Sequence, residues 1–119
     1  MREIKFRAWD LKAKRMDEVW PTPNGCGFYD DRSKDVHEYF DGMYSDVMQY
    51  TGLKDRSGKE IYEGDVLDDN HDGWLWVVGF NDRGCFIAHA PDEKSEWVLL
   101  DDYHFSVIGN IYENPELLT

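Results

Sequence analysis

The sequence has little cysteine and no long hydrophobic segment, and these two absences exclude several common protein classes. Only Cys26 and Cys85 occur in 119 residues, which is too few for a network of disulfides. No apolar stretch approaches the roughly 18 residues that a membrane-spanning helix requires. The chain is charged from Arg2 onward, so its start does not resemble a secretory signal peptide. We therefore expect a cytoplasmic protein with free thiols and no membrane association.

Positive charge is also scarce outside the first residues. The chain has 13 Lys and Arg against 25 Asp and Glu, a formal net charge of -12. Residues 1–15 have a net charge of +4, so residues 16–119 have a net charge of -16. Such a surface repels phosphate backbones within a Debye length of ~8 Å. Nucleic-acid binding is therefore disfavoured unless the basic N-terminal residues act alone. Those residues are Arg2, Lys5, Arg7, Lys12, Lys14 and Arg15.

The hydrophobic pattern indicates short strands separated by turns. Residues 4–9 alternate in the way that predicts a strand with one buried face, and residues 15–20 return as a second strand of a hairpin with its basic side outward. Proline and glycine in residues 21–27 predict a loop, and the pattern in residues 28–46 is weak, although residues 36–40 could form a short helix or strand. Further strands are expected at 47–51, 61–67, 74–80, 85–90, 96–100 and 105–112.

These elements predict a mainly β protein. We expect a single domain over residues 1–119, with an N-terminal hairpin at 1–20 and a variable loop segment at 21–46. Residues 47–119 would form a small, strongly bent SH3-like β-barrel. Its first turn needs a positive φ at Gly58. Asn114 followed by Pro115 predicts a short helical turn at the C-terminus.

Three blocks of sequence resemble a known family. The central block is Gln49-Tyr-Thr-Gly-Leu-Lys-Asp followed by Gly58-Lys-Glu-Ile-Tyr-Glu-Gly-Asp-Val. The opening block is Ile4-Lys-Phe-Arg-Ala-Trp-Asp, and the closing block runs from Val107 to Leu118. Together they are similar to the YopX family, small proteins carried mostly by phages and prophages. The resemblance implies the cytoplasm of a bacterial host. It implies no catalytic or binding residues, because that family has no established biochemical activity.

Residues Asp68 to Gly73 resemble the first half of a calcium-binding loop. Asp68, Asn70 and Asp72 place side-chain oxygens at alternate positions, and a glycine is sixth. The twelfth position, where a glutamate should complete the coordination, is Gly79. A turn rich in Asp and Asn explains the same residues more simply. We expect no metal and no cofactor.

Motifs for catalysis are equally sparse. Asp101 and Asp102 lie close in sequence to His104, as an acid–base pair would, but two acidic residues are also typical of a turn. The sequence has no Gly-x-Ser-x-Gly motif and no phosphate-binding glycine loop. We expect a protein that is not an enzyme.

The chain is rich in aromatic residues, at 15%. Some of them alternate with expected core residues and should face outward, where they would anchor a partner. These interaction candidates are Trp9, Trp20, Tyr62, Trp76 and Tyr112, together with the acidic Asp101 and Asp102.

Three hypotheses of function follow. The leading one is a non-enzymatic interaction or regulatory module with an acidic surface, which forms a homo-oligomer and binds a basic host or phage protein. The alternative is a protein that associates with nucleic acid through its basic N-terminal strand. A second alternative is a metal-dependent enzyme centred on residues 68–72.

Overall fold

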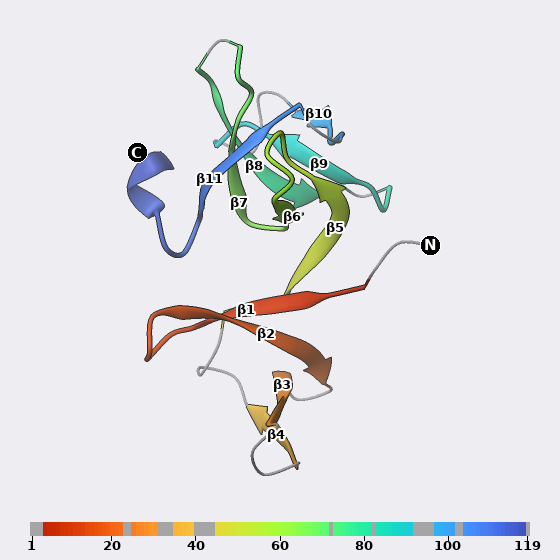
Figure 1. Ribbon diagram of the computed structural model, residues 1–119, viewed down its shortest axis with the longest axis vertical. Helices are drawn as coiled ribbons and strands as arrows, with labels where there is room; N and C mark the ends of the chain where they lie inside the picture. The colour runs from red at the N-terminus through yellow and green to blue at the C-terminus, as the bar shows by residue number, and fades with distance from the viewer. Residues whose placement is uncertain are drawn as a thin grey trace. The chain divides into compact units, whose positions relative to one another are not determined.

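The computed structural model describes residues 4–22, 25–30, 35–39, 45–71, 73–81, 83–91, 97–101 and 104–118. The chain divides into two compact units, Met1–Gln49 and Tyr50–Thr119 (Figure 1). Three residues named above, Arg2, Asp72 and Asp102, lie outside the described part of the chain.

The first unit is an antiparallel sheet whose strands follow one another in sequence. Phe6 pairs with Val19, so the alternating apolar residues of the first two strands share one face. Ala8 and Val19 form the buried core of this face, with Phe6 and Val47 packed against them. The first residues of β5 extend the sheet beside β1. The strands are β1 (Phe6–Asp10), β2 (Arg15–Thr22), β3 (Gly25–Asp30), β4 (Asp35–Tyr39) and β5 (Met48–Lys54).

The prediction of a loop segment at 21–46 is wrong. Strands β3 and β4 lie within it, and β2 continues through Thr22. Pro21 pairs with Cys26, and Gly27 pairs on its other side with Glu38. Proline and glycine are weak strand formers, but backbone ladders on both sides of β3 hold this stretch extended, a contribution that local sequence does not reveal.

The second unit is also made of antiparallel strands. The later residues of β5 pair with β6, and the other strands form a sheet in the order β10-β9-β8-β7-β11. A 3-10 helix, η1 (Pro115–Leu118), gives the expected turn at the C-terminus. The strands are β6 (Glu60–Tyr62), β7 (Asp65–Asp68), β8 (Leu75–Phe80), β9 (Phe86–His89), β10 (Trp97–Leu99) and β11 (Ser106–Asn110).

The expectation of a mainly β protein is confirmed, with strands in two antiparallel sheets. The expected barrel is not closed. Within the described residues, β10 and β11 are the two edges of the second sheet and do not pair with each other. No helix of that part of the chain is long and apolar enough to span a membrane.

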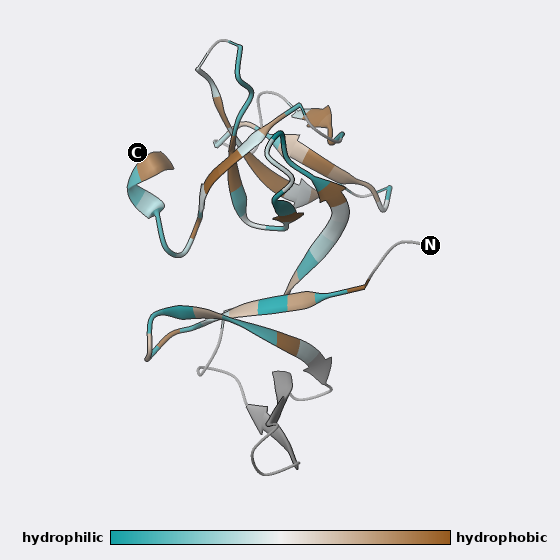
Figure 2. Cartoon of the chain, viewed as in Figure 1, coloured by the Kyte–Doolittle hydropathy of each residue, from teal (hydrophilic) through white to brown (hydrophobic). Residues whose placement is uncertain are grey.

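The core of the second unit lies on one face of its sheet. Leu67 is opposite Trp76, and Val78 is opposite Ala88, so these four side chains point the same way. Figure 2 shows hydrophobic residues concentrated in these strands and hydrophilic ones in the turn that follows β7. Burying each large aliphatic side chain contributes about 1.5–3 kcal/mol. The buried cluster is Ile61, Leu67, Trp76, Val78, Ala88 and Phe105.

Candidate functional site

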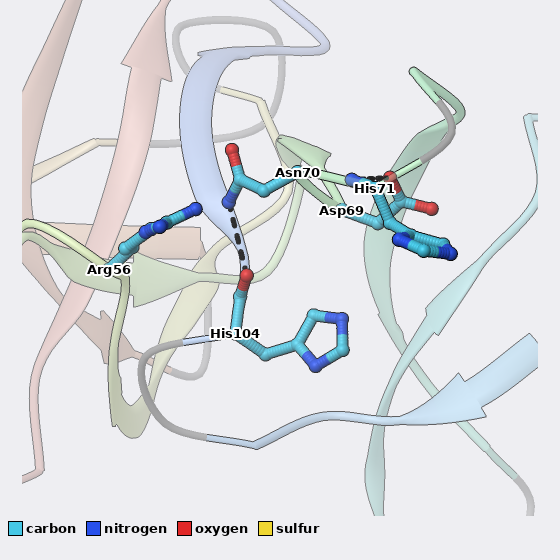
Figure 3. Close-up of a pocket in the computed structure, with 5 residues that line it drawn as sticks. All are labelled: Arg56, Asp69, Asn70, His71 and His104. Carbon is cyan, nitrogen blue, oxygen red and sulfur yellow. Dashed lines mark hydrogen bonds between the residues drawn. The ribbon is translucent and has the colours of Figure 1, made fainter.

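A pocket of about 490 Å³ opens on the second unit (Figure 3). Three segments that are distant in sequence form it: the turn between β5 and β6, the loop after β7, and the residues that precede β11. Its lining is polar, and four of its five side chains are exposed to solvent. The lining residues are Arg56, Asp69, Asn70, His71 and His104.

The buried carboxylate of Asp55 organises the first of these segments. One of its oxygens accepts hydrogen bonds from the Ser57 N–H, the Ser57 hydroxyl and the Lys59 N–H, at 2.8–2.9 Å. The other accepts from the N–H of Val107 at 2.9 Å. Gly58 completes the turn with a φ of +91°, which confirms the positive φ expected there. The carboxylate thus shapes the turn and also ties it to β11.

This arrangement lowers the pKa of Asp55. Its side chain is only 2% exposed, and burial by itself would raise the pKa. The hydrogen bonds from Val107, Lys59 and Ser57 together outweigh burial and hold the pKa of Asp55 below its usual value. Asp55 is therefore an ionised structural group directly beside Arg56 in sequence.

Arg56 is fixed at its backbone and free at its side chain. Its N–H donates to the carbonyl of Phe105 at 2.7 Å, which places it next to His104. Among the described residues, no carboxylate pairs with its guanidinium. In Figure 3 the Arg56 side chain extends toward the side of the pocket where Asn70 lies.

The loop after β7 forms the opposite wall. Asp68 accepts a hydrogen bond from the N–H of Asn70 at 2.8 Å, and Asp69 accepts one from the N–H of His71 at 2.9 Å. Asn70 has a positive φ of +62°, a conformation that asparagine tolerates. Its amide donates to the carbonyl of His104 and to the hydroxyl of Ser106, both at 3.0 Å (Figure 3). These contacts fasten the loop to His104 and to the first residue of β11.

The same contacts bear on the calcium-like pattern. Asp68 and Asn70 direct their side chains to hydrogen bonds of the loop itself and of its neighbour, as a turn rich in Asp and Asn does. The described residues contain no group of three or more His, Cys, Asp or Glu that could hold a metal ion. Asp101 approaches His104 at 4.0 Å, and both side chains are more than half exposed. This geometry gives a weak surface contact.

An exposed apolar strand is the second feature of this unit. All three residues of β10 are exposed: Trp97 at 58%, Val98 at 39% and Leu99 at 65%. We call these three residues the β10 edge. Strand β10 pairs with β9 on one side and is the last strand in its sheet. The sequence predicts this strand within residues 96–100 but not its exposure, because an apolar strand at an edge has the same pattern as a buried one.

Two predicted interaction residues are corrected by the structure. Trp9 is 7% exposed and Trp76 is 8% exposed, so neither presents a surface. Trp76 is opposite Leu67 and belongs to the core of the second unit. Alternation assigned them to the outer faces of their strands. In a small β protein, however, the other face of a strand is covered too, and alternation alone cannot show this.

The other predicted interaction residues differ in exposure. Trp20 is 54% exposed and contacts the ring of Phe6 edge to face at 6.0 Å. Tyr62 and Tyr112 are half-buried, and Tyr62 packs its ring 5.4 Å from that of Tyr50. Asp101 is exposed. These residues come from separate strands and turns, and none of them is among the residues that line the pocket.

The basic residues of the first unit fall into two groups. Lys12, Lys14 and Arg15 are exposed at the turn between β1 and β2. Lys5 and Arg7 are half-buried, and Arg7 lies in β1 opposite Glu18 and Met48. The sequence predicts that the basic side of this hairpin faces outward. In the structure, the basic residues of β1 and of the segment before it are only partly exposed. Arg15 also contacts Asp17 at 3.2 Å, which offsets part of the local positive charge.

Asp10 forms the turn that carries these basic residues. Its carboxylate accepts hydrogen bonds from the N–H of Ala13 at 2.8 Å and of Lys12 at 3.0 Å. The bond from Ala13 is the main reason that the pKa of Asp10 lies below its usual value. The exposed cations Lys12, Lys14 and Arg15 thus sit on a turn that a carboxylate organises.

Comparison with known proteins places the chain in a family. The family model described as YopX protein matches residues 5–119. Among solved structures, the crystal structure of protein EF1440 from Enterococcus faecalis is similar over 100% of both chains, with a TM-score of 0.71 and 29% sequence identity. No curated protein matches the chain. Because the family model covers nearly all of the sequence, the chain belongs to the YopX family.

Proposed function

We propose that this protein is a non-enzymatic interaction module that binds an extended segment of a basic protein along its β10 edge. The observation that carries this proposal is the exposure of all three residues of a terminal strand, two of them by more than half. Such a strand is a liability for a soluble protein unless a partner covers it.

The geometry of the β10 edge suits addition of a strand. The outer side of β10 has no pairing strand among the described residues, so its backbone N–H and C=O groups are available to an extended peptide. Trp97 and Leu99 are two residues apart and share one face of the sheet, where they offer adjacent apolar contacts. Tryptophan is among the residues that contribute most to protein interfaces.

The net charge of the chain indicates which kind of protein partner it would attract. Residues 16–119 have a net charge of -16, so a cationic segment would be attracted to this part of the chain and an acidic one repelled. A basic host or phage protein therefore fits the edge best. A second copy of the chain could also pair β10 with β10, which would give the proposed homo-oligomer, although like charges oppose it.

We also propose that the second unit is related to SH3-like barrels. Strands β7 to β10 follow one another in the sheet, and β11 returns to lie beside β7. This strand order supports the relationship, and domains of that kind often act as binding modules. The likeness is one of fold and does not itself assign a function.

Capture from bacterial lysate on immobilised protein, with nuclease present, tests the proposed interaction. A double variant, Trp97→Lys with Leu99→Lys, adds positive charge and removes both apolar contacts from the β10 edge. The matched control is Trp74→Lys with Ile4→Lys, which makes the same change at two other exposed positions.

We expect a nuclease-resistant protein that the wild type and the control capture and that the β10 variant loses. Capture by the β10 variant at wild-type level would rule out the edge as the binding surface. Capture that disappears with nuclease would support the nucleic-acid alternative.

A further inference from the structure

We propose that the pocket lined by Arg56, Asn70 and His104 binds the phosphate group of a small phosphorylated ligand. The pocket is separate from the β10 edge, so this site is independent of the proposed protein interaction. Its volume of about 490 Å³ lies within the range of small-molecule sites, roughly 300–1,000 Å³.

The pocket is held in shape before any ligand binds. Arg56 is anchored to Phe105 through its N–H, and the preceding Asp55 is anchored to Val107. Asn70 is anchored to His104 through its amide. All three walls therefore depend on the segment from residue 104 to residue 107. A ligand would not have to order the walls, which lowers the cost of binding.

The chemistry of the lining favours an anion. The Arg56 guanidinium has five N–H donors in a planar fork that matches phosphate oxygens, and no described carboxylate occupies it. The imidazoles of His71 and His104 line the other sides of the pocket (Figure 3). Charge-assisted bonds from arginine to phosphate are about twice as strong as neutral ones.

The nearby carboxylates limit what kind of anion can bind. Asp69 accepts a hydrogen bond from the N–H of His71, and Asp101 lies 4.0 Å from His104. The chain as a whole has a charge of -12. A polyanion such as nucleic acid would extend over this acidic surface and be repelled, because exposed charges interact over ~8 Å. One phosphate on a small molecule that contacts Arg56 meets only the Asp69 carboxylate among the lining residues, so it avoids most of that repulsion.

Two variants test the site. Arg56→Gln removes the guanidinium, and Arg83→Gln makes the same charge change at an exposed arginine in the turn between β8 and β9. Each protein, and the β10 double variant, is labelled with ¹⁵N and titrated at constant ionic strength. The probes are inorganic phosphate, adenosine monophosphate and acetate.

We expect phosphate to shift the amide signals of Arg56, Asn70, His71 and His104, and Arg56→Gln to weaken binding at least about tenfold. Arg83→Gln and the β10 variant should bind as the wild type does. Tighter binding of adenosine monophosphate than of phosphate would show that a nucleoside fills the rest of the pocket, and equal binding would limit recognition to the phosphate. Equal shifts with acetate, or equal losses in both arginine variants, would overturn the proposal.

Discussion

At the scale of single residues, four buried polar groups explain much of the local structure. Among the described residues, the buried polar side chains are Thr51, Asp55, Asp65 and Asn110. Each satisfies backbone groups at a turn or, in the case of Thr51, on the neighbouring strand. Thr51 donates to the carbonyl of Ile61, and Asp65 accepts from the N–H of Tyr62, both at 2.8 Å. Asn110 accepts from the N–H groups of Tyr112 and Glu113.

All four lie in the blocks that resemble the YopX family. In this chain these residues satisfy buried backbone groups, and an unsatisfied backbone group there would cost about 1–3 kcal/mol. The pocket lies beside Asp55, and its location could not be predicted because residues 56, 70 and 104 meet only in the folded chain.

Replacing Asp55 tests this reasoning. Asp55→Asn keeps one oxygen but presents an N–H₂ group to the N–H of Val107, so a buried donor loses its acceptor. We expect a loss of about 1–3 kcal/mol in the free energy of unfolding, measured in urea. Asp101→Asn, at an exposed carboxylate, should change it by less than about 0.5 kcal/mol.

The same variant should alter the response to acid. The pKa of Asp55 is lower in the folded chain than its usual value of 3.8, so its stabilisation is complete above that value. It is lost as the pH falls below 3.8 through the folded-state pKa. In Asp55→Asn the free energy of unfolding should therefore fall less steeply over this acidic pH range than in the wild type. An unchanged acid limb and an unchanged free energy of unfolding would show that Asp55 contributes no net stability.

At the scale of elements, the sequence predicted strands where alternation was strong. Phe6 and Ala8 share the buried face with Val19, as the period of two requires. The prediction was wrong for residues 21–46, where pairing between strands overrides the turn-forming residues. It also missed the exposure of β10, because the position of a strand in its sheet depends on pairing that is distant in sequence.

The exposed β10 predicts how copies of this chain associate. Raising salt to about 1 M shortens the Debye length to ~3 Å and removes most of the repulsion between acidic copies. We expect sedimentation to show a wild-type homo-oligomer that strengthens with salt. The variant with Trp97→Lys and Leu99→Lys should remain monomeric. Self-association that weakens with salt, or that persists in this variant, would place the contact elsewhere.

At the scale of the whole molecule, charge is the property that sequence alone predicted best. The +4 of residues 1–15 and the -16 of the remainder require no knowledge of the fold. The structure adds that the exposed cations Lys12, Lys14 and Arg15 gather at one turn, whereas Arg7 is half-buried. An acidic body with an apolar strand edge is suited to a cationic protein partner more than to nucleic acid.

The most direct test of the interaction proposal is amide hydrogen exchange of the protein alone and with the captured partner bound. We predict that the β10 amides that point away from β9, which alternate along Trp97, Val98 and Leu99, become protected in the complex, because an added strand would accept their hydrogen bonds. Protection confined to the turn at residues 11–15, with β10 unchanged, would contradict the account and would favour the basic hairpin as the binding surface.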